Sequence, residues 1–338
     1  MTSINLNLGD RGYTVTVGKG ILSSADKYFN LDRKVFIVTD SNVPEEYAIA
    51  VSKRCKSSTI YTVAEGEGSK SLSTLEALLT EMMNFGMKRG DAAIAVGGGV
   101  VGDLTGFAAS VYMRGIDFYN VPTTLLSQVD SSIGGKTAVN LGETKNIVGA
   151  FHQPKAVLID TDVLKTLPKR QIGAGLAEAL KMSMTSNAEL FDFFENEKIT
   201  EDSYEKIITD ALMIKKAVVE ADEKETGLRK ILNFGHTLGH GIEAESGLSA
   251  LYHGECVALG MIPVCSDEVR KRLLPILKKI GLPTEYNGNL DAALSFVSHD
   301  KKATSDGLDV IFVEEIGSYE IKKMTAEDFS SLVKRNFK

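Results

Sequence analysis

The chain has 338 residues, of which 43% are apolar and 25% charged, and this length exceeds what one hydrophobic core usually supports, so two domains are expected. Its net charge of −7 argues against a general affinity for nucleic acids. No apolar stretch reaches the ~20 residues of a membrane span, the start of the chain shows no secretion signal, and three cysteines are too few for a disulfide framework. We therefore expect a cytoplasmic protein that binds neither nucleic acid nor membrane.

The first half of the chain alternates strand-like and helix-like segments. Apolar or alternating runs predict strands over residues 13–17, 34–39, 59–63, 92–96, 118–121 and 156–159. Apolar residues at helical spacing predict helices over residues 71–85 and 104–112. Strands that alternate with helices indicate a mostly parallel sheet covered on both faces, and ligands bind such sheets beyond the carboxyl ends of the strands.

After Pro168 the pattern changes to helices with little strand between them. Helices are predicted over residues 171–186, 189–197, 204–222, 236–246 and 254–272. A short hairpin is expected from residues 308–312 and 318–321. The sequence thus predicts an α/β domain over residues 1–168 and a mainly α-helical domain over residues 169–338.

A glycine-rich turn follows the predicted strand that ends at Val96. Gly97, Gly99 and Gly102 match the G-x-G-x-x-G pattern, with a strand before it and a helix after it. Glycines let the backbone approach a pyrophosphate closely, and the N-terminus of the helix offers N–H donors to it. The pattern alone is weak, because many such turns bind nothing and Asp117 is a poor match for the acidic residue expected about 20 positions on.

A second glycine-rich stretch, residues 130–136, is expected to form a loop together with Lys145 and Asn146. Glycine-rich backbone with lysine and asparagine side chains suits a phosphate or a carboxylate, although a solvated loop without a ligand explains the pattern equally well. Basic side chains gathered in one cleft of an acidic protein would select a ligand with at least two negative charges. The candidates for this cleft are Arg114, Lys136, Lys145, Lys181, Lys215 and Arg229.

Three of the five histidines fall close together in the sequence, at His236, His240 and His253. Imidazole is a common ligand of zinc and related ions, whereas a helix that merely carries two histidines is the plainer interpretation. Upstream, Glu178 and Lys181 share one side of a helix that begins with small apolar residues, so a buried carboxylate is the alternative to a surface ion pair. The spacing nominates Glu178, His236 and His240 as a catalytic zinc set with one position open to substrate.

These motifs together resemble those of the 3-dehydroquinate synthase family across nearly the whole chain. The matching stretches are residues 97–103, 113–115, 121–126, 130–136, 145–146, 175–178, 233–236 and 253–255. The resemblance implies an α/β NAD-binding domain, a helical metal-binding domain, a homodimer, and dependence on NAD and on zinc or cobalt. The part after Arg272 diverges and contributes little.

The resemblance changes the metal set, because it implies Glu178, His236 and His253 as the ligands and His240 as a contact of the substrate phosphate. Residues implied to contact NAD are Asp40, Asn42, Glu67, Lys70, Gly98, Gly99, Val100, Val101, Gly102, Asp103, Thr123, Thr124, Lys136, Lys145, Thr166 and Leu167. Residues implied to contact the substrate are Asp130, Lys136, Asn146, Lys181, Lys215, Glu225, Arg229, Asn233 and His240. Arg114 is implied to reach the site of the neighbouring subunit, and either Lys301 or Lys302 is implied to enter the pocket.

The implied activity converts 3-deoxy-D-arabino-heptulosonate 7-phosphate to 3-dehydroquinate and phosphate, a lyase step of the shikimate pathway. NAD oxidises the C5 hydroxyl, phosphate leaves by β-elimination, and the hydride returns before an aldol closes the ring. The alternatives are a related cyclase acting on sedoheptulose 7-phosphate or glucose 6-phosphate, a metal-dependent polyol dehydrogenase that releases NADH, and a non-catalytic binding protein. Lys215, Asn233 and His240 favour the dehydroquinate pattern.

Overall fold

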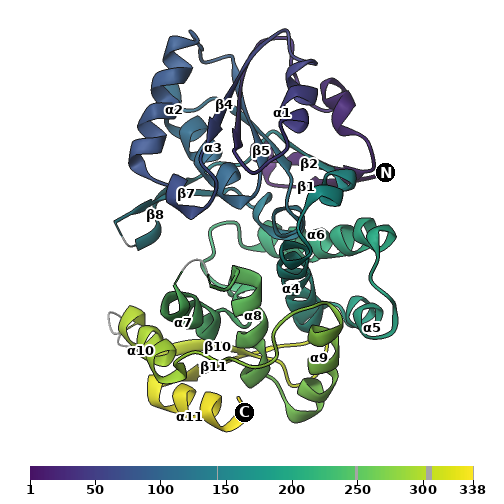
Figure 1. The fold of residues 1–338 in the computed structure, drawn as a ribbon, viewed down its shortest axis with the longest axis vertical. Helices are drawn as coiled ribbons and strands as arrows, with labels where there is room; N and C mark the ends of the chain where they lie inside the picture. The colour runs from purple at the N-terminus through teal and green to yellow at the C-terminus, as the bar shows by residue number, and fades with distance from the viewer. Residues whose placement is uncertain (143, 248–249, 302–306, 338) are drawn as a thin grey trace. The chain divides into compact units, whose positions relative to one another are not determined.

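The computed structural model describes residues 1–142, 144–247, 250–301 and 307–337. The chain divides into two compact units, Met1–Leu167 (unit 1) and Pro168–Lys338 (unit 2). This division lies one residue before the predicted domain boundary. Figure 1 shows that unit 1 is built around a sheet and that unit 2 is built mainly of helices.

Seven strands form the sheet of unit 1. They are β1 (Thr2–Leu6), β2 (Tyr13–Gly18), β3 (Lys34–Asp40), β4 (Ser57–Val63), β5 (Ala92–Gly97), β6 (Asp117–Pro122) and β9 (Ala156–Asp160). Their order in the sheet is β1-β2-β9-β6-β5-β3-β4, and all neighbours pair in parallel except β1 with β2. The predicted mostly parallel sheet is therefore confirmed, and every predicted strand of this half lies within one of these elements.

Helices cover both faces of this sheet because its central strands are apolar on both sides. The helices are α1 (Glu45–Ser52), α2 (Leu72–Asn84) and α3 (Gly99–Val111). In β3, Val35 and Ile37 pack on one face with α1. Phe36 and Val38 pack on the opposite face with α2 and α3, so that α1 and α2 lie on opposite sides of the strands (Figure 1). Burial of each such side chain contributes about 1.5–3 kcal/mol, which makes the sheet the core of unit 1.

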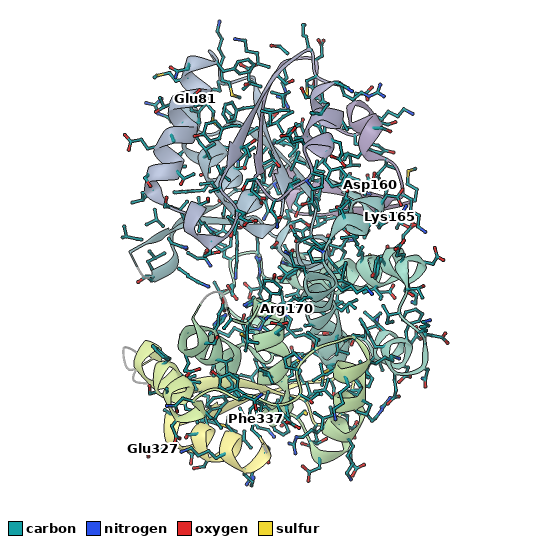
Figure 2. The ribbon with its side chains drawn as sticks, viewed as in Figure 1. Glu81, Asp160, Lys165, Arg170, Glu327 and Phe337 are labelled. Atoms are coloured by element: carbon teal, nitrogen blue, oxygen red, sulfur yellow. The ribbon has the colours of Figure 1, made fainter. Side chains whose placement is uncertain are left out.

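The carboxyl ends of β3 and β5 mark the place where sheets of this kind bind ligands. The two strands are neighbours, but the chain leaves β3 toward α1 on one face and leaves β5 toward α3 on the other. Such a reversal opens a crevice beyond the strand ends. Asp40 ends β3 and Gly97 ends β5. Along the same edge Pro122 ends β6, and Asp160 (labelled in Figure 2) ends β9.

The helix predicted to start at residue 104 instead begins at Gly99. Its first turns are rich in glycine, which disfavours a helix by about 1 kcal/mol per residue and so obscured the start. The glycines are needed for packing, because a Cβ on Gly106 would lie 2.5 Å from Thr137 Cγ2.

Of the loop predicted around residues 130–136 and 145–146, residues 132–135 lie outside any helix or strand, as predicted, whereas Lys136, Lys145 and Asn146 lie in an antiparallel hairpin. It consists of β7 (Lys136–Leu141) and β8 (Thr144–Phe151). Glycine lowers strand propensity and hid the second strand from the sequence pattern. In the structure Gly149 is required, because a Cβ there would collide with the backbone of the facing strand.

Unit 2 is mainly helical, as predicted. Its helices are α4 (Lys169–Ser186), α5 (Ala188–Asn196), α6 (Tyr204–Ala221), α7 (His236–Ser246), α8 (His253–Met261), α9 (Asp267–Lys279), α10 (Leu290–Lys301) and α11 (Ala326–Asn336). One antiparallel hairpin, β10 (Leu308–Phe312) with β11 (Glu320–Met324), lies where a hairpin was predicted. Over the described residues, none of the helices has both the length and the apolar character to span a membrane.

The single helix predicted over residues 254–272 is wrong, because the chain breaks it into α8 and α9. Pro263 lies in a short 3-10 turn after α8, and Cys265 is extended. Ser266 then caps α9, accepting the backbone N–H of Val269 at 3.3 Å. Apolar residues continue at helical spacing across the break, so the sequence pattern could not reveal where α8 ends.

Candidate functional site

Helix α4 carries a carboxylate and an ammonium group into the interior of unit 2. Its residues 173–177 are glycine, alanine and leucine, which leave room for neighbouring helices. Glu178 and Lys181 have exposed fractions of 1% and 2%, and Lys181 Nζ lies 2.5 Å from Glu178 Oε2. The prediction of a buried helix rather than a surface ion pair is confirmed. Burying such a pair costs desolvation free energy that its attraction often fails to recover, which points to a function.

Close contacts between backbones bring three helices of unit 2 together. A Cβ on Gly254 would collide with the carbonyl oxygen of Ala174, so only glycine lets the start of α8 lie this close to α4. A Cβ on Gly260 would collide with the carbonyl oxygen of Gly235, so α8 also lies directly against the start of α7. His253 precedes Gly254 and His236 follows Gly235. Both histidines therefore lie next to the positions where the helix backbones come closest.

The carboxylate of Glu178 faces two imidazoles. Its Oε1 lies 3.6 Å from His253 Nε2 and 3.9 Å from His236 Nε2. Among the described residues neither oxygen of Glu178 has a hydrogen-bond partner, since the short contact with Lys181 lacks hydrogen-bond geometry. Two ligands of one tetrahedral zinc ion, each bound at ~2.1 Å, lie roughly 3.4 Å apart. The carboxylate and the two imidazoles therefore fit a divalent metal.

The place of His240 bears on the choice between the two predicted metal sets. One side-chain nitrogen from each of His236, His240 and His253 lies within 4.8 Å of the other two. Glu178 contacts His236 and His253, whereas His240 is exposed and lines an open cavity of about 840 Å³ in unit 2. This geometry supports the ligand set implied by the resemblance over the set nominated by spacing.

A backbone contact orients His236. Its Nδ1 lies 3.1 Å from the Phe234 carbonyl oxygen, and its Nε2 faces Glu178. Burial, together with the positive charge of Lys181, lowers the pKa of His236 well below its usual 6.5. The ring is therefore neutral at pH 7, and a proton on Nδ1 leaves the lone pair of Nε2 for a metal.

A second carboxylate meets His253. Its Nδ1 lies 3.2 Å from Glu243 Oε2. Burial lowers the pKa of His253, but the hydrogen bond to Glu243 and the charges of Glu178 and Glu243 outweigh burial and raise the pKa. Surroundings that favour a proton on this ring also favour a bound cation. Glu243 was not among the predicted site residues, although its position seven residues after His236 puts both on one side of α7.

Three of the residues implied to contact the substrate line the open cavity of unit 2. The cavity lining includes Glu225, Asn233 and His240, and Asn233 Nδ2 donates a hydrogen bond to Glu225 Oε1 at 3.3 Å. Lys215 is buried on α6, like Lys181 on α4. Of the implied substrate contacts in this unit, Lys181 and Lys215 are therefore buried, whereas Glu225, Asn233 and His240 lie at the cavity surface.

A turn after α6 fixes Arg229. Asp222 accepts the backbone N–H groups of Thr226, Gly227 and Arg229 at 2.9, 2.7 and 3.0 Å. Those hydrogen bonds, that from Arg229 foremost, lower the pKa of Asp222 far below its usual value. The Arg229 side chain is 2% exposed, and its Nη1 donates to the Glu223 carbonyl oxygen at 2.6 Å. Asp222 was not predicted, although an aspartate just after a helix and before Thr-Gly is a turn signal.

The start of α8 is tied to α4 by a forked ion pair. Nε and Nη2 of Arg170, labelled in Figure 2, donate to Glu255 Oε1 and Oε2 at 2.6 and 2.7 Å. Glu255 also accepts the backbone N–H of Tyr252 at 2.7 Å, which caps α8. A forked arginine–carboxylate pair is geometrically specific. It therefore fixes the helix end that carries His253.

In unit 1 the glycine-rich turn joins β5 to the N-terminus of α3. Gly98 is the N-cap, and within the described part of the chain no side chain caps this end. The N–H groups of the first turn thus have no partner within the helix and suit a phosphate. Part of the motif also serves packing. A Cβ on Gly97 would lie 2.6 Å from the Val101 side chain, and a Cβ on Gly102 would lie 3.3 Å from Asn120.

Lys70 connects further candidates of unit 1. Its Nζ donates hydrogen bonds to Asp103 and to Asn146. Glu67 Oε1 accepts a hydrogen bond from Asn140 Nδ2 at 2.8 Å. Asn140 Oδ1 in turn accepts the backbone N–H of Asn146 at 2.9 Å. The structure thus joins the four predicted residues in one network, and Asn140 is a member that the sequence did not reveal.

Other candidates for NAD contacts lie at the carboxyl edge of the sheet. Asp40 Oδ1 accepts the backbone N–H of Asn42 at 2.9 Å. The backbone N–H of Thr123 donates to the Gly97 carbonyl oxygen at 2.9 Å. Thr124, Thr166 and Leu167 lie in the segments that follow β6 and β9.

The basic candidates of unit 1 lie partly on the hairpin. Lys136 begins β7 and is exposed, and Lys145 lies half-buried in β8. Asp130 lies in the helical turn Ser127–Ser131. The lysine implied within residues 300–302 falls outside the side chains that the structure describes.

Backbone strain coincides with predicted site residues in both units. Among the described non-glycine residues, a positive φ occurs at Met113 (49°), Arg114 (68°), Asn146 (57°) and Glu225 (59°). Such conformations cost about 1–3 kcal/mol each and cluster at functional sites. All of them except Met113 are candidate site residues.

Comparison with solved structures defines the class first. The structure is similar to 2-deoxy-scyllo-inosose synthase in complex with carbaglucose-6-phosphate, NAD+ and Co2+, with a TM-score of 0.88 and 26% identity over 99% of this chain and 100% of that chain. It is also similar to 2-epi-5-epi-valiolone synthase from Streptomyces hygroscopicus subsp. jinggangensis 5008 with NAD+ and Zn2+ bound, with a TM-score of 0.84 and 26% identity over 96% of each chain. The fold is that of the sugar-phosphate cyclases.

Sequence comparison then identifies the family. Residues 60–174 match the family model for the N-terminal part of 3-dehydroquinate synthase, and residues 175–303 match the model for its C-terminal part. A 3-dehydroquinate synthase from Streptococcus sanguinis (strain SK36) is 39% identical over 98% of this chain and 99% of its own length. The chain belongs to the 3-dehydroquinate synthase family.

Proposed function

We propose that this protein converts 3-deoxy-D-arabino-heptulosonate 7-phosphate to 3-dehydroquinate and phosphate, a step of aromatic amino acid biosynthesis. Family membership supports this activity. The structural observation that carries it is the buried carboxylate of Glu178. Among the described residues its Oε1 has no hydrogen-bond partner, and it faces Nε2 of both His236 and His253.

The proposed cofactors are NAD and one divalent ion, zinc or cobalt. The two similar solved structures carry NAD+ with Co2+ and NAD+ with Zn2+. In this chain Glu178, His236 and His253 would hold the metal, and the N-terminus of α3 and the network around Lys70 would hold NAD. When bound, NAD supplies a reversible hydride acceptor and the metal polarises a substrate oxygen.

The basic side chains of unit 2 would orient the substrate. Arg229 offers a planar fork that can bind a carboxylate through two hydrogen bonds. Asn233 and His240, at the cavity wall, would bind the phosphate. Lys181, 2.5 Å from Glu178, would hold positive charge beside the metal ligands and so favour loss of a proton from a bound hydroxyl.

The proposed assembly is a cytoplasmic homodimer in which Arg114 reaches the neighbouring subunit's site. The positive φ of Arg114 supports a special role for this exposed residue. The net charge of −7 argues against nucleic acid as a partner. A small anionic sugar phosphate is the proposed ligand besides the cofactors.

The test is to incubate the purified chain with the heptulosonate phosphate, NAD and Co2+, and to follow phosphate, 3-dehydroquinate and NADH together. Phosphate and 3-dehydroquinate should form in equal amounts while the absorbance of NADH stays flat, because the hydride returns within each turnover. Growth of NADH in proportion to substrate consumed would contradict the proposal and favour a polyol dehydrogenase.

A further inference from the structure

The imidazole of His253 lies between two carboxylates that belong to different helices. Its Nε2 lies 3.6 Å from Glu178 Oε1 on α4, and its Nδ1 lies 3.2 Å from Glu243 Oε2 on α7. Glu178 is assigned above as a metal ligand. Glu243 thus meets the ring at Nδ1, whereas Glu178 meets it at Nε2, the nitrogen that would bind the metal.

An imidazole that binds a metal through one nitrogen usually donates the N–H of its other nitrogen to a carboxylate or a backbone carbonyl. That second contact fixes the tautomer and the rotation of the ring. His236 has such a contact in the Phe234 carbonyl oxygen, 3.1 Å from its Nδ1. Glu243 is the corresponding group for His253.

We propose that Glu243 is a positioning residue of the metal site, whose carboxylate fixes the ring of His253 so that Nε2 faces Glu178. This inference rests on the proposed metal site. Because Glu243 and His236 share α7, one helix supplies a metal ligand and also orients the ligand that comes from α8. A shift of α7 would therefore disturb both imidazoles together.

The backbone of His253 is held by other residues, which makes the role of Glu243 separable. The forked pair of Arg170 with Glu255 ties the start of α8 to α4. Removal of the Glu243 carboxylate should thus release the ring while the helix end stays in place.

The experiment measures the dissociation constant for Co2+ by competition with a chelator, using the metal-free full chain at pH 8, where imidazole is ordinarily neutral. Glu243→Ala should bind Co2+ about 10–100-fold more weakly than the native chain. Glu243→Gln should recover most of that loss, because its amide oxygen still accepts the Nδ1–H hydrogen bond. The matched control is Glu195→Gln, which removes the charge of a carboxylate bound to Arg272 in the same unit, and it should bind Co2+ like the native chain.

Native affinity in Glu243→Ala would overturn the positioning role, as would an equal loss in Glu243→Gln or in the Glu195→Gln control. Failure of the native chain to bind Co2+ would overturn the metal site itself and this inference with it. The two proposals therefore fail in distinguishable ways. If the native chain binds Co2+, Glu178→Gln does not, and Glu243→Ala binds it as tightly as the native chain, the metal site stands and only the role of Glu243 is contradicted.

Discussion

The two units present their candidate residues in opposite ways. In unit 1 the candidates lie at strand ends and in short turns, such as Asp40 after β3 and Gly98 before α3. In unit 2 charged side chains lie inside the helical body, with Glu178, Lys181 and Arg229 only 1–2% exposed. The proposed NAD site of unit 1 follows from sheet topology, whereas the proposed metal site of unit 2 depends on close contacts between helices and on buried charge.

The difference has an energetic side. A phosphate site made of backbone N–H groups at a strand–helix turn costs the fold little, because such turns exist in any sheet of this kind. A buried carboxylate such as Glu178 costs desolvation free energy that its attraction to the neighbouring Lys181 ammonium often fails to recover, so a bound metal ion would stabilise the fold. We therefore expect substitutions at the metal and substrate candidates of unit 2 to change metal and substrate binding, and substitutions at the NAD candidates of unit 1 to leave the bound metal in place.

The largest effect is expected from Glu178→Gln, which tests the metal half directly. The variant should lose bound metal and lose more than about 100-fold in kcat, beyond the loss seen when outer contacts of a metal site are removed. Elemental analysis and phosphate release measure the two quantities. As the matched variant, His240→Ala should keep its metal and raise the KM for substrate. Full metal occupancy in purified Glu178→Gln would show that the ligand assignment is wrong.

The second prediction concerns substrate choice by the buried charge of unit 2. The heptulosonate phosphate carries a carboxylate that sedoheptulose 7-phosphate lacks, and a hydrogen bond between charged groups contributes about 1.5–3 kcal/mol. The native chain should therefore prefer the heptulosonate phosphate by about thirtyfold or more in kcat/KM, and Arg229→Ala should lose that preference. Arg229→Lys keeps the charge without the fork and should restore it only partly. Equal efficiency of the native chain with the two sugars would contradict the assigned substrate.

The third prediction tests whether an NAD candidate of unit 1 can be removed without loss of the metal. Lys70→Ala removes the ammonium group that bonds to Asp103 and Asn146. The resemblance implies that this ammonium group also contacts NAD, and a hydrogen bond to a charged group contributes about 1.5–3 kcal/mol, so the KM for NAD should rise about tenfold or more while the metal content stays unchanged. Lys56→Ala, which breaks a surface pair with Asp32 in the same unit, should leave both quantities unchanged. A loss of metal in Lys70→Ala would break the division of roles between the units.

The smallest effect is expected from Asp222→Asn, which loosens the turn that holds Arg229. Because the folded state lowers the pKa of Asp222, its ionised form stabilises the fold at neutral pH. This stabilisation is lost as the pH falls through the ordinary aspartate value near ~3.9 toward the lower folded value. The Tm of Asp222→Asn should be below the native Tm at pH 7, and the difference should shrink below about pH 4. A difference in Tm that grows on acidification would contradict the role given to the carboxylate. The control is Asp210→Asn, which removes a helical ion pair with Lys206.

The same contrast explains what the sequence could predict. Apolar runs such as residues 92–96 predicted the ends of the central strands to within one residue. A strand that is buried on both faces is a continuous apolar run, so a local pattern is enough to find it. The hairpin β7–β8 and the break at Pro263 were missed, since glycine and continued apolar spacing mislead local rules.

The metal set shows where local reasoning ends. Spacing along one helix selects His236 and His240, whereas the approach of α8 to α4 at Gly254 brings in His253. Contacts of this kind join residues far apart in the chain, so composition and periodicity do not reveal them. Glu243 was missed for the same reason, because a charged residue on a helix normally indicates a solvent-exposed face.

The most direct measurement is phosphate release from the heptulosonate phosphate by the native chain before and after removal of metal, with NAD present throughout. Chelation should stop phosphate release, and Co2+ or Zn2+ should restore it in the native chain but not in Glu178→Gln. Release at the native rate from fully chelated protein, or restoration of Glu178→Gln by added metal, would contradict a catalytic metal held by Glu178, His236 and His253.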